Sequence, residues 1–124
     1  MKKILFITTF VVFVFIPISV YGAIVINEVY YDPEGADTGL EYIILYNNED
    51  NSYSLTDHCL YASGKHYVFN SFNLGSKEKI IIYWNADGTN SSTNLYTGKE
   101  EWSNMGNTSG TVALFSTHES HKSS

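Results

Sequence analysis

The chain has 124 residues, of which 44% are hydrophobic and 16% are charged, and this composition fits one globular domain. Only two Pro and nine Gly occur and 15% of the residues are aromatic, which excludes a collagen-like or generally disordered chain. All 7 basic residues are lysines and face 13 acidic residues, so the formal charge is −6 and no Arg is available for bidentate phosphate contacts. Nucleic acid is therefore not expected as a partner.

The N-terminal segment is typical of an export signal. Lys2 and Lys3 precede the uncharged residues 4–20, and the small residues Gly22 and Ala23 flank a suitable cleavage position. We expect residues 1–22 to be removed as a signal peptide, which places the mature protein outside the cell or at the cell surface. The alternative is a membrane anchor formed by residues 4–20, because this stretch reaches the short limit for a spanning helix.

From residue 23 onward, short apolar runs alternate with clusters of Gly, Asn, Asp and Ser, which predicts β-strands and no helix. The expected strands span residues 23–31, 40–47, 53–55, 59–62, 66–69, 79–84 and 111–116. The strands at 59–62 and 66–69 flank a tight turn and should pair as a hairpin. Three consecutive isoleucines, at 80–82, predict a strand that is covered on both faces.

Residues 85–110 form a long polar segment that Leu95, Tyr96, Trp102 and Met105 interrupt. A loop of this length is usually functional or held down by its own hydrophobic side chains. Residues 117–124 have the composition of a polar C-terminal tail. The number and spacing of the short strands predict an all-β fold, with a β-sandwich over residues 23–116.

Cys59 is the single cysteine, so no disulfide can form within the chain. We predict that Cys59 is a small buried side chain between His58 and Leu60, because free Cys is among the most buried residue types. The functional alternative is a reactive nucleophile or an intermolecular bridge.

Several segments carry a family resemblance when they are taken as a set: residues 26–29, 31–35, 41–47, 54–55, 67–75, 80–84, 102–104 and 110–114. In this order they resemble the lamin tail domain family, an immunoglobulin-like β-sandwich known from nuclear lamins and from bacterial secreted proteins. The resemblance implies an immunoglobulin-like fold, no cofactor, no catalytic residue and a role as an exported interaction or structural module.

The chain departs from the family pattern at three places. Ile44 stands where the family commonly has a second Glu, and His58 and Cys59 stand where it has a Gly-Trp step. Most members also continue past the strand that matches residues 111–116 into a closing strand. We therefore expect a sandwich that lacks its closing strand and offers an open edge for a strand-paired dimer. A fragment of a larger surface protein or hydrolase is a further alternative.

Aromatic side chains on the outer sheet face are the candidate binding residues. If Ile43 and Leu45 face the core, their neighbours in the strand form an apolar outer stripe, because successive side chains alternate between faces. Such a surface suits a protein or a cell-surface polymer. The competing function is a carbohydrate-binding module that uses the same aromatic rings. The candidates are Tyr42, Ile44, Tyr46, Tyr96 and Trp102.

Two acidic groups invite functional hypotheses. Asp32, Glu34 and Asp37 could gather oxygens around a calcium ion, but their spacing matches no known calcium loop and turn chemistry explains them as well. We therefore expect no metal site. Glu28 and Glu41 could act as a carboxylate pair on a glycosidic bond. A structural role is preferred, because Glu28 continues an inward-facing period of two along its strand and would need a hydrogen-bonding partner there.

Overall fold

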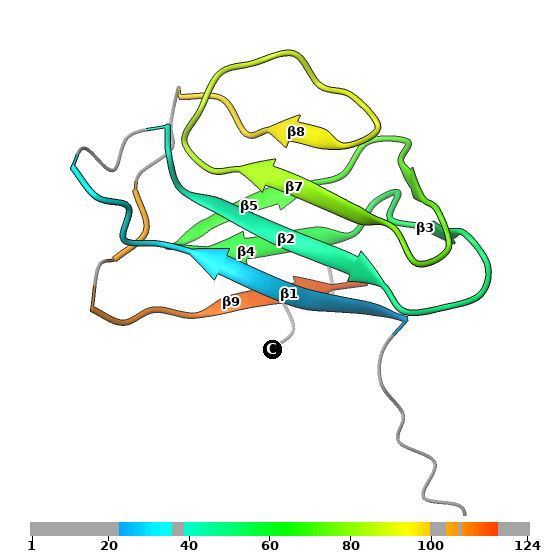
Figure 1. Cartoon of the computed structure of the whole chain (residues 1–124). Helices are drawn as coiled ribbons and strands as arrows, with labels where there is room; N and C mark the ends of the chain where they lie inside the picture. Colours follow the sequence, from blue (N-terminus) through cyan, green and yellow to red (C-terminus); the bar gives the residue numbers. More distant parts are fainter. Residues whose placement is uncertain (1–22, 36–38, 100–103, 107, 117–124) are drawn as a thin grey trace, which may run out of the picture.

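Short strands and the turns between them make up nearly all of the computed structural model, which describes residues 23–35, 39–99, 104–106 and 108–116 (Figure 1). The predicted signal peptide, residues 1–22, and the predicted tail, residues 117–124, lie outside the described residues. Within the described part, no helix is long and apolar enough to cross a membrane.

The larger sheet has four strands in the order β1-β2-β7-β8. They are β1 (Ile24–Tyr30), β2 (Tyr42–Asn47), β7 (Lys79–Tyr83) and β8 (Asn94–Tyr96). β2 runs antiparallel to both β1 and β7, whereas β8 runs parallel to β7. β2 and β7 are the two internal strands of this sheet, and each pairs with a strand on both sides.

A second sheet faces the first and has the order β5-β4-β9. Its strands are β4 (Cys59–Ala62), β5 (Lys65–Val68) and β9 (Val112–Phe115), and a two-stranded pair of β3 (Tyr53–Ser54) and β6 (Asn73–Leu74) lies beside it. Figure 1 shows β1, β2 and β7 in front of β4 and β5, so the layers form a sandwich. The predicted all-β fold and the β4–β5 hairpin are confirmed.

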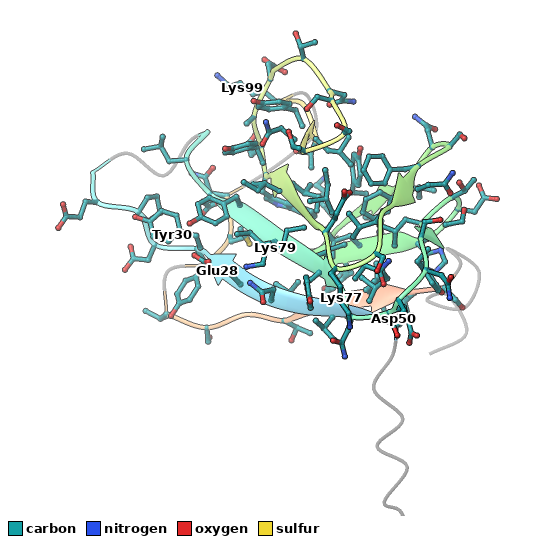
Figure 2. The ribbon with its side chains drawn as sticks, turned by 45° about the vertical axis from the view of Figure 1, so that its right-hand side comes forward. Glu28, Tyr30, Asp50, Lys77, Lys79 and Lys99 are labelled. Carbon is teal, nitrogen blue, oxygen red and sulfur yellow. The ribbon has the colours of Figure 1, made fainter. Side chains whose placement is uncertain are left out.

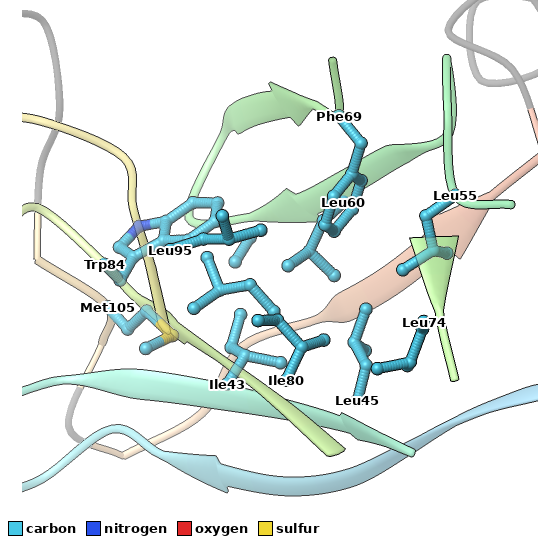
Figure 3. Close-up of a cluster of buried hydrophobic side chains, with 12 residues drawn as sticks. Ile43, Leu45, Leu55, Leu60, Phe69, Leu74, Ile80, Trp84, Leu95 and Met105 are labelled. Atoms are coloured by element: carbon cyan, nitrogen blue, oxygen red, sulfur yellow. The ribbon is translucent and has the colours of Figure 1, made fainter. Parts of the chain in front are cut away.

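The core lies between the two sheets and is built from the side chains that point inward from the strands of both sheets (Figure 3). Ile43 and Leu45 of β2 oppose Ile82 and Ile80 of β7, and none of the four has exposed surface. Leu60 of β4 meets them from the other sheet. Each such side chain contributes roughly 1.5–3 kcal/mol by leaving water, so this layer supplies much of the driving force for folding.

The expectation that β7 is covered on both faces is wrong. Ile80 and Ile82 are fully buried, but Ile81 is half-buried and Lys79 is exposed. The sheet is therefore covered on one face only. Ile81 points to the outer face and packs beside its neighbouring side chains there. Two short strands, β6 and β8, were also not expected from the sequence pattern.

The long polar segment after β7 is held down by its own hydrophobic side chains, which is one of the two alternatives that its length predicted. Leu95 and Met105 are nearly fully buried in the core. The Met105 N–H donates to Glu41 Oε2 over 2.7 Å, and Asn85 Nδ2 donates to Asn104 Oδ1 over 2.7 Å. Trp102 lies outside the described residues.

A β-bulge in β1 corrects the expectation for Glu28. Ile26 pairs with Leu45, yet Glu28 pairs with the very next residue of β2, Ile44, so Asn27 is the extra residue. One inserted residue reverses the faces of all side chains after it. Glu28 consequently lies on the outer face and is exposed, instead of continuing the inward period of Ile24 and Ile26.

Cys59 is fully buried and unoxidised, which confirms the prediction of a buried small side chain. Burial raises the pKa of the Cys59 thiol above its ordinary value of 9.0, because the thiolate loses solvation. A thiol with a raised pKa is a poor nucleophile at neutral pH. The catalytic alternative for this residue therefore has no support.

β9 is an edge strand within the described part of the chain. It pairs with β4 on one side, and no described strand pairs with it on the other side. At the same open side of the sandwich, the core-facing Ile26 of β1 remains 37% exposed. The described residues thus leave one side of the sandwich uncovered.

Asn47, at the end of β2, is a buried polar side chain that joins the turn after β2 to the end of β6 and the turn that follows it. Its Nδ2 donates to the carbonyl oxygens of Asn51, Leu74 and Gly75 over 2.9, 3.0 and 3.1 Å. Its Oδ1 accepts from the N–H of Glu49 over 2.9 Å. Buried carbonyl groups need such donors, so this amide fixes the turn after β2 against the turn after β6.

Replacing Asn47 by Asp tests this role. The isosteric N47D variant keeps the acceptor but loses the amide donor, and it places a carboxylate against carbonyl oxygens in a site without solvent exposure. We expect the free energy of unfolding in urea to fall by about 3 kcal/mol or more. The exposed neighbour Asn48 provides the control, and N48D should change it by less than about 0.5 kcal/mol. Equal losses in both variants would contradict the role of the Asn47 amide.

Candidate functional site

Four tyrosines form one row across the outer face of the larger sheet. Tyr30 of β1 pairs with Tyr42 of β2, Tyr42 pairs with Tyr83 of β7, and Tyr83 pairs with Tyr96 of β8. Directly paired residues project from the same face of a sheet. We call this row the tyrosine ladder, and it spans the full width of the sheet.

The rings of the tyrosine ladder pack against one another. The centroid distance is 5.0 Å between Tyr30 and Tyr42 and 6.1 Å between Tyr42 and Tyr83, with interplanar angles of 34° and 67°. Tyr83 and Tyr96 are stacked, with 5.0 Å between centroids and 14° between planes. Such pairs add about 0.5–1.5 kcal/mol beyond burial, so the ladder stiffens the outer face.

The β7–β8 loop covers the end of the ladder at β8. A Cβ atom added to Gly88 would overlap the Tyr96 ring, which shows how closely the loop backbone approaches it. Two hydrogen bonds fix the loop there: the Tyr96 N–H donates to Asn90 Oδ1 over 2.9 Å, and the Gly98 N–H donates to the Ala86 carbonyl over 2.8 Å. Tyr96 is therefore held between Tyr83 and the loop.

Two further rows complete the surface that we call the outer face. The second row holds Glu28, Ile44, Ile81 and Asn94, and the third holds Val25, Tyr46 and Lys79. The apolar stripe expected from the sequence lies on this face, because its members are half-buried while their neighbours Ile43 and Leu45 are fully buried. The stripe consists of Tyr42, Ile44 and Tyr46, and Tyr96 joins the same face.

Sequence reasoning missed Tyr30 and Tyr83 as members of this surface. Both stand in expected strands, but nothing in the sequence states which residue of one strand lies opposite which residue of the next. The available signal for Tyr83 was its position two residues after Ile81, because residues two apart along a strand project from the same face. Trp102, the remaining candidate, lies outside the described residues.

Glu28 connects the first and second rows. The Tyr42 hydroxyl donates to Glu28 Oε1 over 2.9 Å, and Figure 2 shows Glu28 beside Tyr30 near the end of β1. This hydrogen bond, together with slight desolvation and the charge of Glu28, raises the pKa of Tyr42 above its ordinary value of 10.0. Tyr42 is therefore a neutral donor throughout the physiological range.

Glu28 and Glu41 do not form a carboxylate pair. Glu28 is exposed on the outer face, whereas Glu41 is fully buried and accepts the hydrogen bond from Met105. The two side chains lie on opposite sides of the sheet, so they cannot flank one bond of a substrate. Glu41 instead has the structural role of anchoring the segment that contains Met105.

The described residues contain no group of three or more His, Cys, Asp or Glu side chains that could hold a metal ion. Asp32 and Glu34 are exposed, and the third calcium candidate, Asp37, lies outside the described part. The calcium hypothesis therefore gains no support from the arrangement of Asp32 and Glu34.

Two hollows lie at the rims of the sandwich. One, of about 570 Å³, is lined by Val29, Tyr31, residues 61–63, Met105, Gly106 and residues 109–112. The other, of about 410 Å³, lies between residues 69–73 and residues 90–92. The second hollow has an aromatic floor and a rim of amide and hydroxyl side chains.

Comparison with protein families identifies the fold. The family model described as Lamin Tail Domain matches residues 17–123, which is most of the chain. The chain therefore belongs to the lamin tail domain family, and its two facing sheets are the immunoglobulin-like sandwich of that family. Curated proteins were also searched, and none matches the chain. The family is one of non-catalytic modules.

The hydrogen bond between Tyr42 and Glu28 can be tested by titration. In the Glu28→Ala variant the pKa of Tyr42 should fall toward 10.0. The variant lacks the carboxylate that accepts a hydrogen bond from the neutral phenol and repels the phenolate. Glu28→Gln should give an intermediate value, since the amide oxygen still accepts the bond. The measurement is the pH dependence of the Tyr42 ring carbon signals in NMR spectra.

Tyr67 provides the internal control for this titration. Its pKa is raised by burial and not by Glu28, so it should be the same in all three proteins. The pKa of Tyr42 is higher in the folded state than in the unfolded state. The hydrogen bond to Glu28 therefore stabilises the fold below about pH 10, and this stabilisation is lost as the pH rises through the folded-state pKa. An unchanged Tyr42 pKa in Glu28→Ala would contradict the contact.

Proposed function

We propose that this lamin tail domain is an exported, non-enzymatic interaction module, and that the outer face is its docking surface for a second copy of the same protein. The observation that supports this proposal is the tyrosine ladder across all four strands, which presents one exposed and three half-buried aromatic rings on one face of the sheet. Tyrosines of this kind are enriched among the residues that dominate protein–protein binding energy.

The packing of the rings favours a protein partner over a sugar at this surface. A sugar stacks on an aromatic ring whose face is open to solvent. In the ladder, Tyr83 and Tyr96 are stacked on each other and Gly88 packs against Tyr96, so the ring faces are already in use. The outer face therefore presents ring edges and hydroxyl groups beside Ile44 and Ile81. This combination of apolar and polar groups suits a protein partner.

The outer face is complementary to itself in one orientation. A twofold axis parallel to the strands, between β2 and β7, places Ile44 over Ile81 of the second copy. The same rotation places Tyr46 opposite Lys79, a cation–π pair, and Glu28 opposite Asn94, a hydrogen-bonding pair. A twofold axis perpendicular to the strands would instead bring Glu28 against its own copy and is disfavoured.

The outer face is small for a protein–protein interface. Four strands about 4.8 Å apart and three rows about 7 Å apart cover roughly 400 Å² per copy. That area lies below the size of a stable interface, so the association is weak, with a dissociation constant on the order of 100 μM to 1 mM. Tethering or crowding many copies on a surface would raise their local concentration enough for pairing.

Sedimentation equilibrium from about 10 μM to 1 mM tests the proposal. Wild-type protein should show a monomer–dimer equilibrium in this range. Ile44→Lys places a charge at the centre of the contact, and Lys79→Glu replaces the cation opposite Tyr46, so each should weaken dimerisation at least tenfold. Circular dichroism of each variant checks that the fold is kept.

Lys99→Glu is the charge-matched control, because Lys99 is exposed and lies outside the three rows of the outer face. It changes the net charge by the same amount as Lys79→Glu and should leave the dimerisation constant unchanged. A wild-type protein that stays monomeric at 1 mM would overturn the proposal. A dimer that survives both Ile44→Lys and Lys79→Glu would place the contact elsewhere, as at the open edge of β9.

Export is the second element of the proposed function, and the N-terminal segment supports it through its basic start, apolar stretch and small residues at 22 and 23. In a bacterial host that secretes through signal peptides, the intact mass of the exported protein should correspond to a chain that begins at Ala23. Ala23→Pro should impair cleavage and serves as the control. A mass that still includes residues 1–22 would contradict cleavage and would favour the alternative of a membrane anchor.

A further inference from the structure

We infer that the hollow between residues 69–73 and residues 90–92 binds a neutral oligosaccharide. This groove of about 410 Å³ lies away from the tyrosine ladder, and its lining includes no ladder residue. Its two walls come from the β5–β6 connection on one side and the β7–β8 loop on the other. The inference goes beyond the docking surface proposed above and is independent of it.

The first wall is fixed before any ligand binds. The Phe69 N–H donates to the His58 carbonyl over 3.0 Å, and the Leu55 N–H donates to the Phe72 carbonyl over 2.9 Å. The Phe72 N–H in turn donates to Thr56 Oγ1 over 3.2 Å. A wall held in this way loses little conformational entropy on binding.

The second wall is fixed by the turn that precedes β8. The Ser91 N–H donates to the Asn94 carbonyl over 2.8 Å, and the Asn94 N–H donates to Ser91 Oγ over 3.1 Å. The amide oxygen of Asn90 accepts from the Tyr96 N–H. Ser92, between these anchored residues, extends from the wall and is exposed.

The floor of the groove is an aromatic cluster. Tyr67 and Phe69 make an edge-to-face contact with 5.1 Å between centroids, and Phe69 and Phe72 follow at 6.3 Å. Phe69 and Leu95 are almost fully buried, whereas Phe72 is half-buried and borders the hollow. A ring in this position offers an apolar surface to the C–H face of a pyranose.

The rim supplies hydrogen-bonding groups without charge. The side chains of Asn70, Ser71, Asn73 and Ser92 are exposed and make no hydrogen bond to another described residue. Amides and hydroxyls both donate and accept, which matches the hydroxyl groups of a sugar. No Asp, Glu, Lys or His lines this groove, although the chain carries a formal charge of −6.

These features favour a neutral glycan over the other candidate ligands. An anionic polymer would find no cation in the lining, and a basic ligand would find no carboxylate. A peptide added as a strand would use the backbone of an open edge, whereas this rim offers side-chain amides from two loops. An uncharged polyol above an aromatic floor satisfies both the rim and the floor.

NMR titration of the exported chain, 15N-labelled, tests the inference with defined probes. Hexaoses of β-1,4-glucose, β-1,4-N-acetylglucosamine and α-1,6-mannose serve as neutral ligands, and hexagalacturonate serves as the anionic one. At least one neutral hexaose should shift the backbone signals of residues 69–73 and 90–92 and the side-chain amides of Asn70 and Asn73. The dissociation constant should increase at least tenfold in the Asn70→Ala/Asn73→Ala variant.

Asn48→Ala is the matched control, because Asn48 is an exposed asparagine that is not among the residues lining the groove, and binding should be unchanged. Phe72→Leu keeps an apolar side chain and removes the ring, so it should weaken binding without unfolding the domain. The inference is overturned if no neutral hexaose shifts the groove signals or if the shifts fall on the tyrosine ladder. It is equally overturned if hexagalacturonate binds as well as the neutral sugars.

Discussion

The pairing of β2 with β7 is the constraint on which the rest of the structure depends. Ile43 lies opposite Ile82 and Leu45 lies opposite Ile80, and these four side chains form the fully buried centre of the core. Because side chains alternate between faces, a slip of one residue would bring Ile44 inward and expose the core residues. The same register that buries the isoleucines therefore places Tyr42 beside Tyr83 on the outside.

Both ends of β2 are secured by buried polar side chains that reach distant parts of the chain. Glu41, immediately before the strand, accepts the N–H of Met105, which is 64 residues away. Asn47, at the other end, donates to Leu74 and Gly75. Hydrogen bonds between buried polar groups have strict requirements for distance and direction, so these two residues define where the loops at each end of the sandwich lie.

β8 connects the two surfaces to which functions are proposed. Its neighbouring residues Leu95 and Tyr96 point to opposite faces: Leu95 borders the groove, and Tyr96 ends the tyrosine ladder. The β7–β8 loop shares this double role, because Gly88 packs against Tyr96 while Ser92 lines the groove. One short strand and its loop thus position both surfaces, with different side chains contributing to each.

Local patterns in the sequence were sufficient for the strands with a clear period of two. The alternation in residues 42–47 indicated which side chains of β2 face the core, and the turn at residues 63–65 indicated the β4–β5 hairpin. The family resemblance, carried by ordered segments, agreed with the lamin tail domain match. The strand faces and the hairpin could be read from the sequence because they depend on residues close together in the chain.

The remaining features depend on contacts between distant residues, so only the tertiary structure decided them. The bulge at Asn27, which turns Glu28 outward, arises where β1 meets β2 and leaves no local signal. β8 has only three residues and is a strand because it pairs with β7. The sequence by itself determined an all-β chain with alternating faces; the alignment of its tyrosines into one row required the register between four strands, which is set by long-range pairing.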